Sequence, residues 1–136
     1  VQYGDTGKRV QRKLLKEVLA KDLDLDYIAG TAVTAEVAIP MLRKKKLDKN
    51  VKLVTQYFNP GVYVGIKRGK IAAAVSLSSV IQGRIAIDQI VRILEGKQYY
   101  KHVGVMLNVV HSGNLRTFDR ASTLAPNGFR TVYSVN

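Results

Sequence analysis

One stretch of the chain, Val51–Ser79, has the hydrophobic pattern of a complete strand-helix-strand unit. Apolar residues lead from Val51 to Val54, and the Asn59-Pro60 pair then turns the chain out of the strand. A continuous apolar run from Ile71 to Val75 follows, which is typical of a parallel strand covered on both faces. We therefore order the rest of the chain around this unit.

Helical spacing of apolar residues predicts four helices. Residues 62–66 form a short one between the two strands, with Gly69 at its left-handed end. Residues 10–19 predict an amphipathic helix, and a further helix around residues 37–42 contains Pro40, which should kink it or make its first half irregular. Residues Val80–Glu95 predict a long helix that is apolar around more of its circumference than one sheet face requires.

Four other segments have strand character. They are the strand end Val1–Tyr3, a short buried strand at Tyr27–Ala29, the candidate Val103–Val110, and Thr131–Val135, which alternates like an edge strand. Strands and helices thus alternate along the chain. This order predicts an α/β fold with a doubly wound parallel sheet in three layers.

The net charge of +12 is the compositional feature that most affects the interpretation. Basic residues are dispersed along the chain, and the dense run Arg43–Lys46 follows a predicted helix, where it suits the negative end of the helix dipole. No aromatic-interleaved basic strand or helix-turn-helix pattern accompanies it, so we expect no nucleic-acid partner. No run of about 20 apolar residues predicts a membrane span. We interpret the start at Val1 as a cut end, so that any targeting signal precedes the sequence.

Residue patterns for catalysis, metals and cofactors are absent from the sequence. There is no cysteine, and His102 and His111 lack a metal-ligand spacing. The serines at 76–79 are not part of a GxSxG elbow, and no GxGxxG motif follows a strand. We therefore predict a protein that is not an enzyme and has no cofactor.

Polar and aromatic residues instead gather in the loops that follow the predicted strands. These residues are Asp5, Thr31, Tyr57, Phe58, Ser76 and Ser78. The carboxyl ends of parallel strands meet at one edge of a sheet, where ligands bind in open α/β folds. Apolar walls with a few polar groups are typical of a small-ligand site. An alternative for Phe58 is packing beneath its own loop.

The order of these motifs resembles the type I periplasmic binding proteins and the LacI-type regulators that share their fold. The segments that carry the resemblance are Asp5–Lys8, Asp26–Glu36, Gly61–Tyr63, Gly69–Ala73, Gln82–Ala86, Leu124–Pro126 and Gly128–Arg130. The resemblance covers essentially the whole chain and the second half of such a protein. It implies that about 1–76 and 109–136 form the C-terminal lobe of two. About 77–108 would cross the hinge, with a helix that packs on the missing N-terminal lobe.

The resemblance also implies a ligand and a partner. Sugar-binding members hold their ligand with polar groups where this chain has Thr31, Tyr57 and Leu77, but Tyr57 replaces an acid and Leu77 an amide. A sugar would leave hydroxyls unpaired there, whereas an aromatic ring suits methyl groups around a positive nitrogen. The implied ligand is a small solute such as trimethylamine N-oxide, and the implied partner is the periplasmic domain of a membrane sensor histidine kinase. An effector domain of a LacI-type transcription regulator and a solute-binding protein of an ABC transporter are the alternatives.

Overall fold

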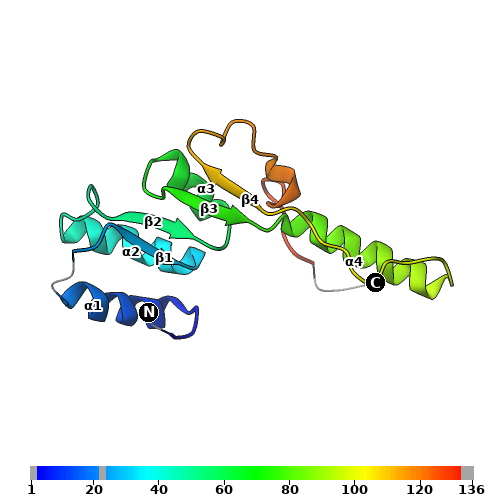
Figure 1. Cartoon of the computed structure of the whole chain (residues 1–136), viewed down its shortest axis with the longest axis horizontal. Coiled ribbons are helices and arrows are strands. Elements are labelled where there is room, and N and C mark those ends of the chain that lie inside the picture. The colour runs from blue at the N-terminus through cyan, green and yellow to red at the C-terminus, as the bar shows by residue number, and fades with distance from the viewer. Residues whose placement is uncertain (1–2, 22–23, 133–136) are drawn as a thin grey trace.

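The computed structural model describes residues 3–21 and 24–132, which fold around a four-stranded sheet. Its strands β1 (Tyr27–Gly30), β2 (Lys52–Thr55), β3 (Ala73–Ser76) and β4 (Asn108–His111) lie side by side in this order (Figure 1). The pairs β1–β2 and β2–β3 are parallel, and β4 is antiparallel to β3. The predicted α/β class with a mainly parallel sheet is confirmed.

Three helices enclose the core against one face of this sheet. They are α1 (Lys8–Ala20), α2 (Ala32–Lys44) and α3 (Pro60–Lys67). Helices α1 and α3 both contact α2. The buried core comprises Leu15, Leu19, Ala35, Ala38, Leu42, Leu53, Val62, Ile66, Ile71, Ala74 and Val110. Each fully buried Leu, Ile or Val side chain of this set contributes about 1.5–3 kcal/mol through removal from water.

The other face of the sheet is largely uncovered by the described residues. Strand side chains alternate between the faces, so Leu53 and Ala74 enter the core while Tyr27 and Val109 are both 57% exposed. The predicted strand at Tyr27–Ala29 is present as β1, but the prediction that it is buried is wrong. The Tyr27 ring instead lies beneath the Lys52 ammonium, 5.7 Å from its centroid.

Helix α2 is helical from its first turn through Pro40, so the predicted irregular first half is wrong. The reason is a capping box, in which the side chains of Thr31 and Thr34 each accept the other residue's backbone N–H. Pro40 removes one backbone donor from the helix interior. The capped first turn and the buried face of α2 outweigh that loss.

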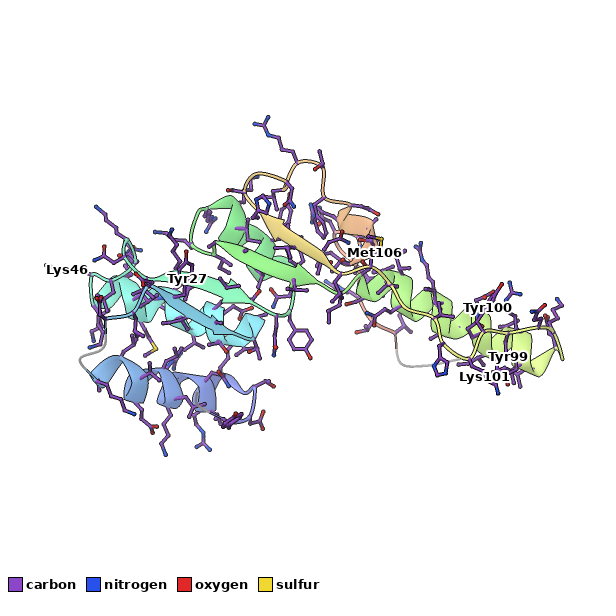
Figure 2. The ribbon with its side chains drawn as sticks, in the orientation of Figure 1. Tyr27, Lys46, Tyr99, Tyr100, Lys101 and Met106 are labelled. Atoms are coloured by element: carbon purple, nitrogen blue, oxygen red, sulfur yellow. The ribbon has the colours of Figure 1, made fainter. Side chains whose placement is uncertain are left out.

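Helix α4 (Ser79–Leu94) leaves the sheet at the end of β3 and projects away from it (Figure 1). None of its residues is buried. The chain then returns alongside α4, where the Tyr100 N–H donates to Gln89 Oε1 (2.7 Å), and carries Tyr99, Tyr100 and Lys101 near the far end of α4 and Met106 near its base (Figure 2).

This return explains why β4 is antiparallel. Asn108 pairs with Ser76, so β4 starts at the edge where β3 ends. The predicted parallel strand Val103–Val110 is therefore wrong in direction, and its first residues, 103–107, are not in a strand. The two predicted terminal strands are not seen in the described residues. Thr131 and Val132 are not in a strand, and residues 133–136 lie outside the described residues. The predicted strand end Val1–Tyr3 falls mostly outside them as well, and Tyr3 is not in a strand. None of the described helices is both long and apolar enough to cross a bilayer.

Candidate functional site

The predicted ligand residues lie in loops at the carboxyl edge of the sheet, where each parallel strand leads into a helix. Thr31 follows β1, Tyr57 and Phe58 follow β2, and Ser76 ends β3. Asp5 lies in the turn that leads into α1. The fold therefore places these residues on the side of the sheet that the sequence predicts.

A buried glutamine joins the Asp5 turn to the start of α2. Gln11 donates from Nε2 to the Asp5 carbonyl (2.7 Å) and accepts at Oε1 from the Thr34 hydroxyl (2.8 Å). The hydroxyls of Thr34 and Thr31 lie 3.0 Å apart. Gly30 leaves room for this arrangement, because a Cβ there would lie 2.7 Å from the Thr34 side chain. The Thr31 hydroxyl is thus engaged in helix capping, and the Asp5 carboxylate accepts the Gly7 N–H (3.1 Å).

A second polar group fixes the loop that carries Tyr57. Asn59 caps α3 by accepting the Val62 N–H (2.8 Å), and its amide donates to Glu36 Oε1 (3.0 Å). The other Glu36 oxygen lies 3.3 Å from Lys8 Nζ. The first residue of α1, the first half of α2 and the cap of α3 are therefore held together by one carboxylate.

Tyr57 and Phe58 have different environments. Tyr57 is 50% exposed, and its carbonyl accepts the Thr55 hydroxyl (2.7 Å). The Phe58 ring is half-buried, with its centroid 5.0 Å from that of Phe118 and 6.4 Å from that of Tyr63. Of the two aromatic residues, Tyr57 has the ring surface that a ligand can reach, and Phe58 packs beneath the loop.

The residues after β3 form a buried junction rather than an open polar surface. The Ser76 hydroxyl lies 2.6 Å from that of Thr123 and accepts the Ser78 N–H (3.3 Å). Ser78 is also buried and has a left-handed backbone (φ 49°), and its hydroxyl is within 3.5 Å of the Met106 carbonyl. Leu77 is half-buried, and its carbonyl accepts from Gln82 (2.6 Å). These contacts hold together the outgoing chain, the returning chain and the C-terminal segment.

Sequence reasoning missed Gln11, Thr34, Glu36, Asn59 and Thr123, which position the predicted residues. The Thr-x-x-Thr spacing of 31 and 34 was the signal available for the cap. Gln11 lies one helical turn before Leu15, on the buried face of α1, which marks it as a polar residue that needs partners. The pairing of Ser76 with Thr123 has no local signal in the sequence, because the two residues lie 47 positions apart.

The described residues include no metal cluster, and two surface hollows can be described. No group of three or more His, Asp or Glu side chains suited to a metal occurs among the described residues. One surface hollow lies along α4, lined by Ser79, Val80, Gly83, Arg84, Ile87 and Asp88. Another lies at the opposite end of the sheet and includes Lys21 and Asn50. The Arg92 side chain on α4 has a shifted pKa. The hydrogen bond that Arg92 donates to the Asp88 carboxylate raises the pKa of the Arg92 guanidinium.

Comparisons with known proteins give a consistent set of relatives, although no family model matches the chain. The chain is 35% identical to the periplasmic protein TorT of Escherichia coli K12 over 133 residues, which cover 98% of this chain and 38% of TorT. The chain thus spans well under half the length of this relative.

Two solved structures extend this result. A solute-binding protein of an ABC transporter from Bradyrhizobium sp. BTAi1, with bound bis-tris, is 53% identical with a TM-score of 0.86, over 98% of this chain and 40% of that protein. TorT in complex with the TorS sensor domain in the presence of TMAO (trimethylamine N-oxide) matches with 30% identity and a TM-score of 0.83, over 96% of this chain and 44% of the other.

Proposed function

We propose, from the premise that this chain is a homologue of TorT with the type I periplasmic binding protein fold, that it forms the C-terminal part of a two-lobed solute-binding protein. The homology confirms the predicted family and the predicted periplasmic location. The relatives are binding and periplasmic proteins, in agreement with the prediction that the chain is not an enzyme. They do not favour a LacI-type transcription regulator.

The proposed domain organisation follows from the chain path around Ser76. Residues 1–76 and 109–136 belong to one lobe, and residues 77–108 leave it and return. The support is that α4 has no buried residue and that the outgoing and returning chains meet at the junction of Ser76, Ser78 and Met106. A helix without buried residues has its packing partner elsewhere, and we assign that partner to the N-terminal lobe.

The proposed ligand site is the carboxyl edge, closed by the other lobe. The observation that carries it is the half-exposed Tyr57 ring on a loop fixed by Asn59 and Glu36. Thr31 and Asp5 supply polar surface beside it, Leu77 lies next to the hinge, and Phe58 supports the loop. Ser76 and Ser78 set the hinge instead of contacting the ligand, because both are buried with partners.

For the ligand we propose a small methylated amine oxide, with trimethylamine N-oxide as the first candidate. The π-face of Tyr57 attracts methyl groups around a positive nitrogen, whereas the apolar Leu77 offers nothing to a sugar hydroxyl. The 30% identity to TorT, whose complex with the TorS sensor domain was solved in the presence of TMAO, supports this choice. The proposed partner is the periplasmic domain of a membrane sensor histidine kinase.

A second candidate function is that of a solute-binding protein of an ABC transporter. The 53% identity to the Bradyrhizobium protein supports it. Both functions use the same cleft between the two lobes. They differ in the partner that detects closure of this cleft, which is a sensor kinase in the first function and a transporter in the second.

Binding of the full-length protein to a sensor-kinase periplasmic domain, measured with and without trimethylamine N-oxide, separates the two functions. The sensor function predicts a complex whose affinity changes with the solute. Solute binding by calorimetry without any complex would instead support the transporter function. Absence of binding to every methylated amine tested would contradict the proposed ligand class.

A further inference from the structure

Much of the positive charge of the chain lies at the pole opposite the carboxyl edge. This surface, which we call the basic pole, is formed by the C-terminal ends of α2 and α3, the turns that lead from them to β2 and β3, and the first residue of β2. It consists of Arg43, Lys44, Lys45, Lys46, Lys49, Lys52, Lys67, Arg68 and Lys70. Figure 2 shows Lys46 at the extreme end of the molecule, away from α4.

The two turns form one continuous surface. All nine basic side chains belong to exposed residues. Asp48 is the acidic residue between residues 43 and 70, and it lies 3.4 Å from Lys70 Nζ, which joins one turn to the other. Within the described part of the chain, the other eight make no ion pair. The neighbouring turn between α1 and β1 has the opposite character, since its sequence contains Asp22, Asp24 and Asp26.

Helix capping does not account for this concentration of charge. Basic residues in the last turn of a helix compensate its dipole, which explains Arg43, Lys44 and Lys67. Lys45 and Arg68 are the C-caps of α2 and α3, where the dipole also favours a positive charge. The remaining four, Lys46, Lys49, Lys52 and Lys70, lie beyond the helix ends or at the start of β2, where that effect does not operate.

Lys46 gives a second indication that positive charge is retained there. It has a left-handed backbone (φ 60°), as do Gly69 after α3 (φ 65°) and Gly96 after α4 (φ 64°). A residue with a Cβ is disfavoured in this conformation, and glycine is not. Two helix ends lie inside the basic pole: the end of α3 has Gly69 in this conformation, whereas the end of α2 has Lys46, which adds a positive charge.

We propose that the basic pole is a docking surface for an anionic phospholipid membrane. Seven of its nine basic residues are lysines, which act as flexible point charges instead of forming the planar, bidentate contacts of arginine. Lysine is depleted from the cores of protein interfaces, where aromatic residues and arginine are enriched. Clusters of exposed lysines are instead attracted to anionic headgroups, and each basic residue near the membrane surface adds to the attraction.

Docking by this pole has a consequence for orientation. The carboxyl ends of β1, β2 and β3, with Tyr57, point away from the basic pole. A protein held to a membrane by the basic pole therefore presents its proposed ligand edge to the aqueous space. This inference concerns a surface that the proposed ligand site does not use, so either can fail without the other.

Co-sedimentation of the full-length protein with phosphatidylcholine vesicles, with and without about one-third phosphatidylglycerol, tests the proposal. We expect binding to the anionic vesicles at ~0.05 M salt, loss of most binding at ~0.5 M, and none to pure phosphatidylcholine. The triple variant Lys45→Glu, Lys46→Glu, Lys49→Glu should lower the partition coefficient by ~100-fold or more, because three attractive charges become repulsive.

A matched control reverses three exposed cations of α1, with Arg12→Glu, Lys13→Glu and Lys16→Glu. It has the same net charge as the first variant and should retain most of the vesicle binding, and thermal melting should show that both variants are folded. Equal losses in the two variants would overturn the proposal in favour of a general charge effect. The proposal would also be overturned if the unmodified protein does not bind anionic vesicles, or if an acidic protein or duplex DNA binds the basic pole while vesicles do not.

Discussion

The hydroxyl groups of Ser76 and Thr123, 47 positions apart in the sequence, lie 2.6 Å from each other and are both buried. Ser76 is the last residue of β3, and Thr123 follows a short 3-10 helix (Arg120–Ser122) that contacts α4. Their hydrogen bond holds the C-terminal segment at the point where the chain leaves the sheet. In the proposed two-lobed protein, this point is the hinge.

The first prediction is that Ser76→Ala lowers the free energy of unfolding by about 1–2 kcal/mol, because it removes the nearer of the two hydroxyls that contact the buried Thr123 hydroxyl and also the acceptor of the Ser78 N–H. The double variant Ser76→Ala, Thr123→Val should lose less than the sum of the single changes, since both polar groups are then removed. Urea unfolding of the full-length protein measures all three. Ser112→Ala, at an exposed turn, is the control and should have little effect. Strictly additive losses would show that the hydroxyls do not interact.

The second prediction concerns the junction of α1 and α2. Thr34→Val removes a capping acceptor and leaves Gln11 Oε1 without its donor. We expect a loss of about 1–2 kcal/mol in unfolding free energy, against little change for the exposed Thr131→Val. Hydrogen exchange should show faster opening of the first turn of α2. Unchanged protection of that turn would contradict the assigned role of Thr34.

The third prediction is that Lys46→Gly stabilises the protein by about 1 kcal/mol, because glycine adopts the left-handed conformation without strain. Gly69→Ala should have the opposite effect of similar size, since it places a Cβ at φ 65°. Thermal unfolding compares the two. The same Lys46→Gly variant should bind anionic vesicles more weakly, so that stability and membrane affinity change in opposite directions. A less stable Lys46→Gly would refute the conformational explanation.

The fourth prediction concerns the exposed apolar face of α4. Ile87, Ile90, Val91 and Leu94 are all exposed, Leu94 at 80%. The isolated 136-residue chain should therefore bind a hydrophobic dye and self-associate, whereas the full-length protein should do neither. Ile87→Lys with Leu94→Lys should reduce dye binding by the isolated chain. A monodisperse isolated monomer that leaves the dye dark would contradict the proposed packing of α4 on a second lobe.

Local features of the fold could be predicted because they depend on a few neighbouring residues. Asn59-Pro60 turns the chain out of β2 as predicted, and in the structure the pair does so as the cap and the first residue of α3. Gly69 and Gly96 follow helices in the left-handed conformation, as glycine at such positions indicates. The bounds of α4, Ser79–Leu94, lie within one residue of the predicted ones.

Features that depend on distant contacts could not be predicted. The direction of β4 is determined by the return of the chain along α4, and the apolar run at residues 103–110 gives no information about that path. The exposure of Tyr27 depends on which face of the sheet the helices cover. The sequence predicts that Ser76 and Ser78 form a polar ligand surface. They are buried because their partners Thr123 and Met106 come from segments that are remote in the sequence.

Calorimetric titration of the full-length protein with trimethylamine N-oxide tests the proposed function most directly, with Tyr57→Ala, Tyr57→Phe and the control Tyr27→Ala. Tyr27 is similarly exposed but lies at the other end of its strand. The account predicts that Tyr57→Ala weakens binding by ~10-fold or more, because a cation–π contact contributes ~0.5–2 kcal/mol. Tyr57→Phe should lose less, since the ring face remains, and Tyr27→Ala should bind like the parent. Unchanged affinity in Tyr57→Ala, or tight binding of a free sugar by the parent, would contradict it.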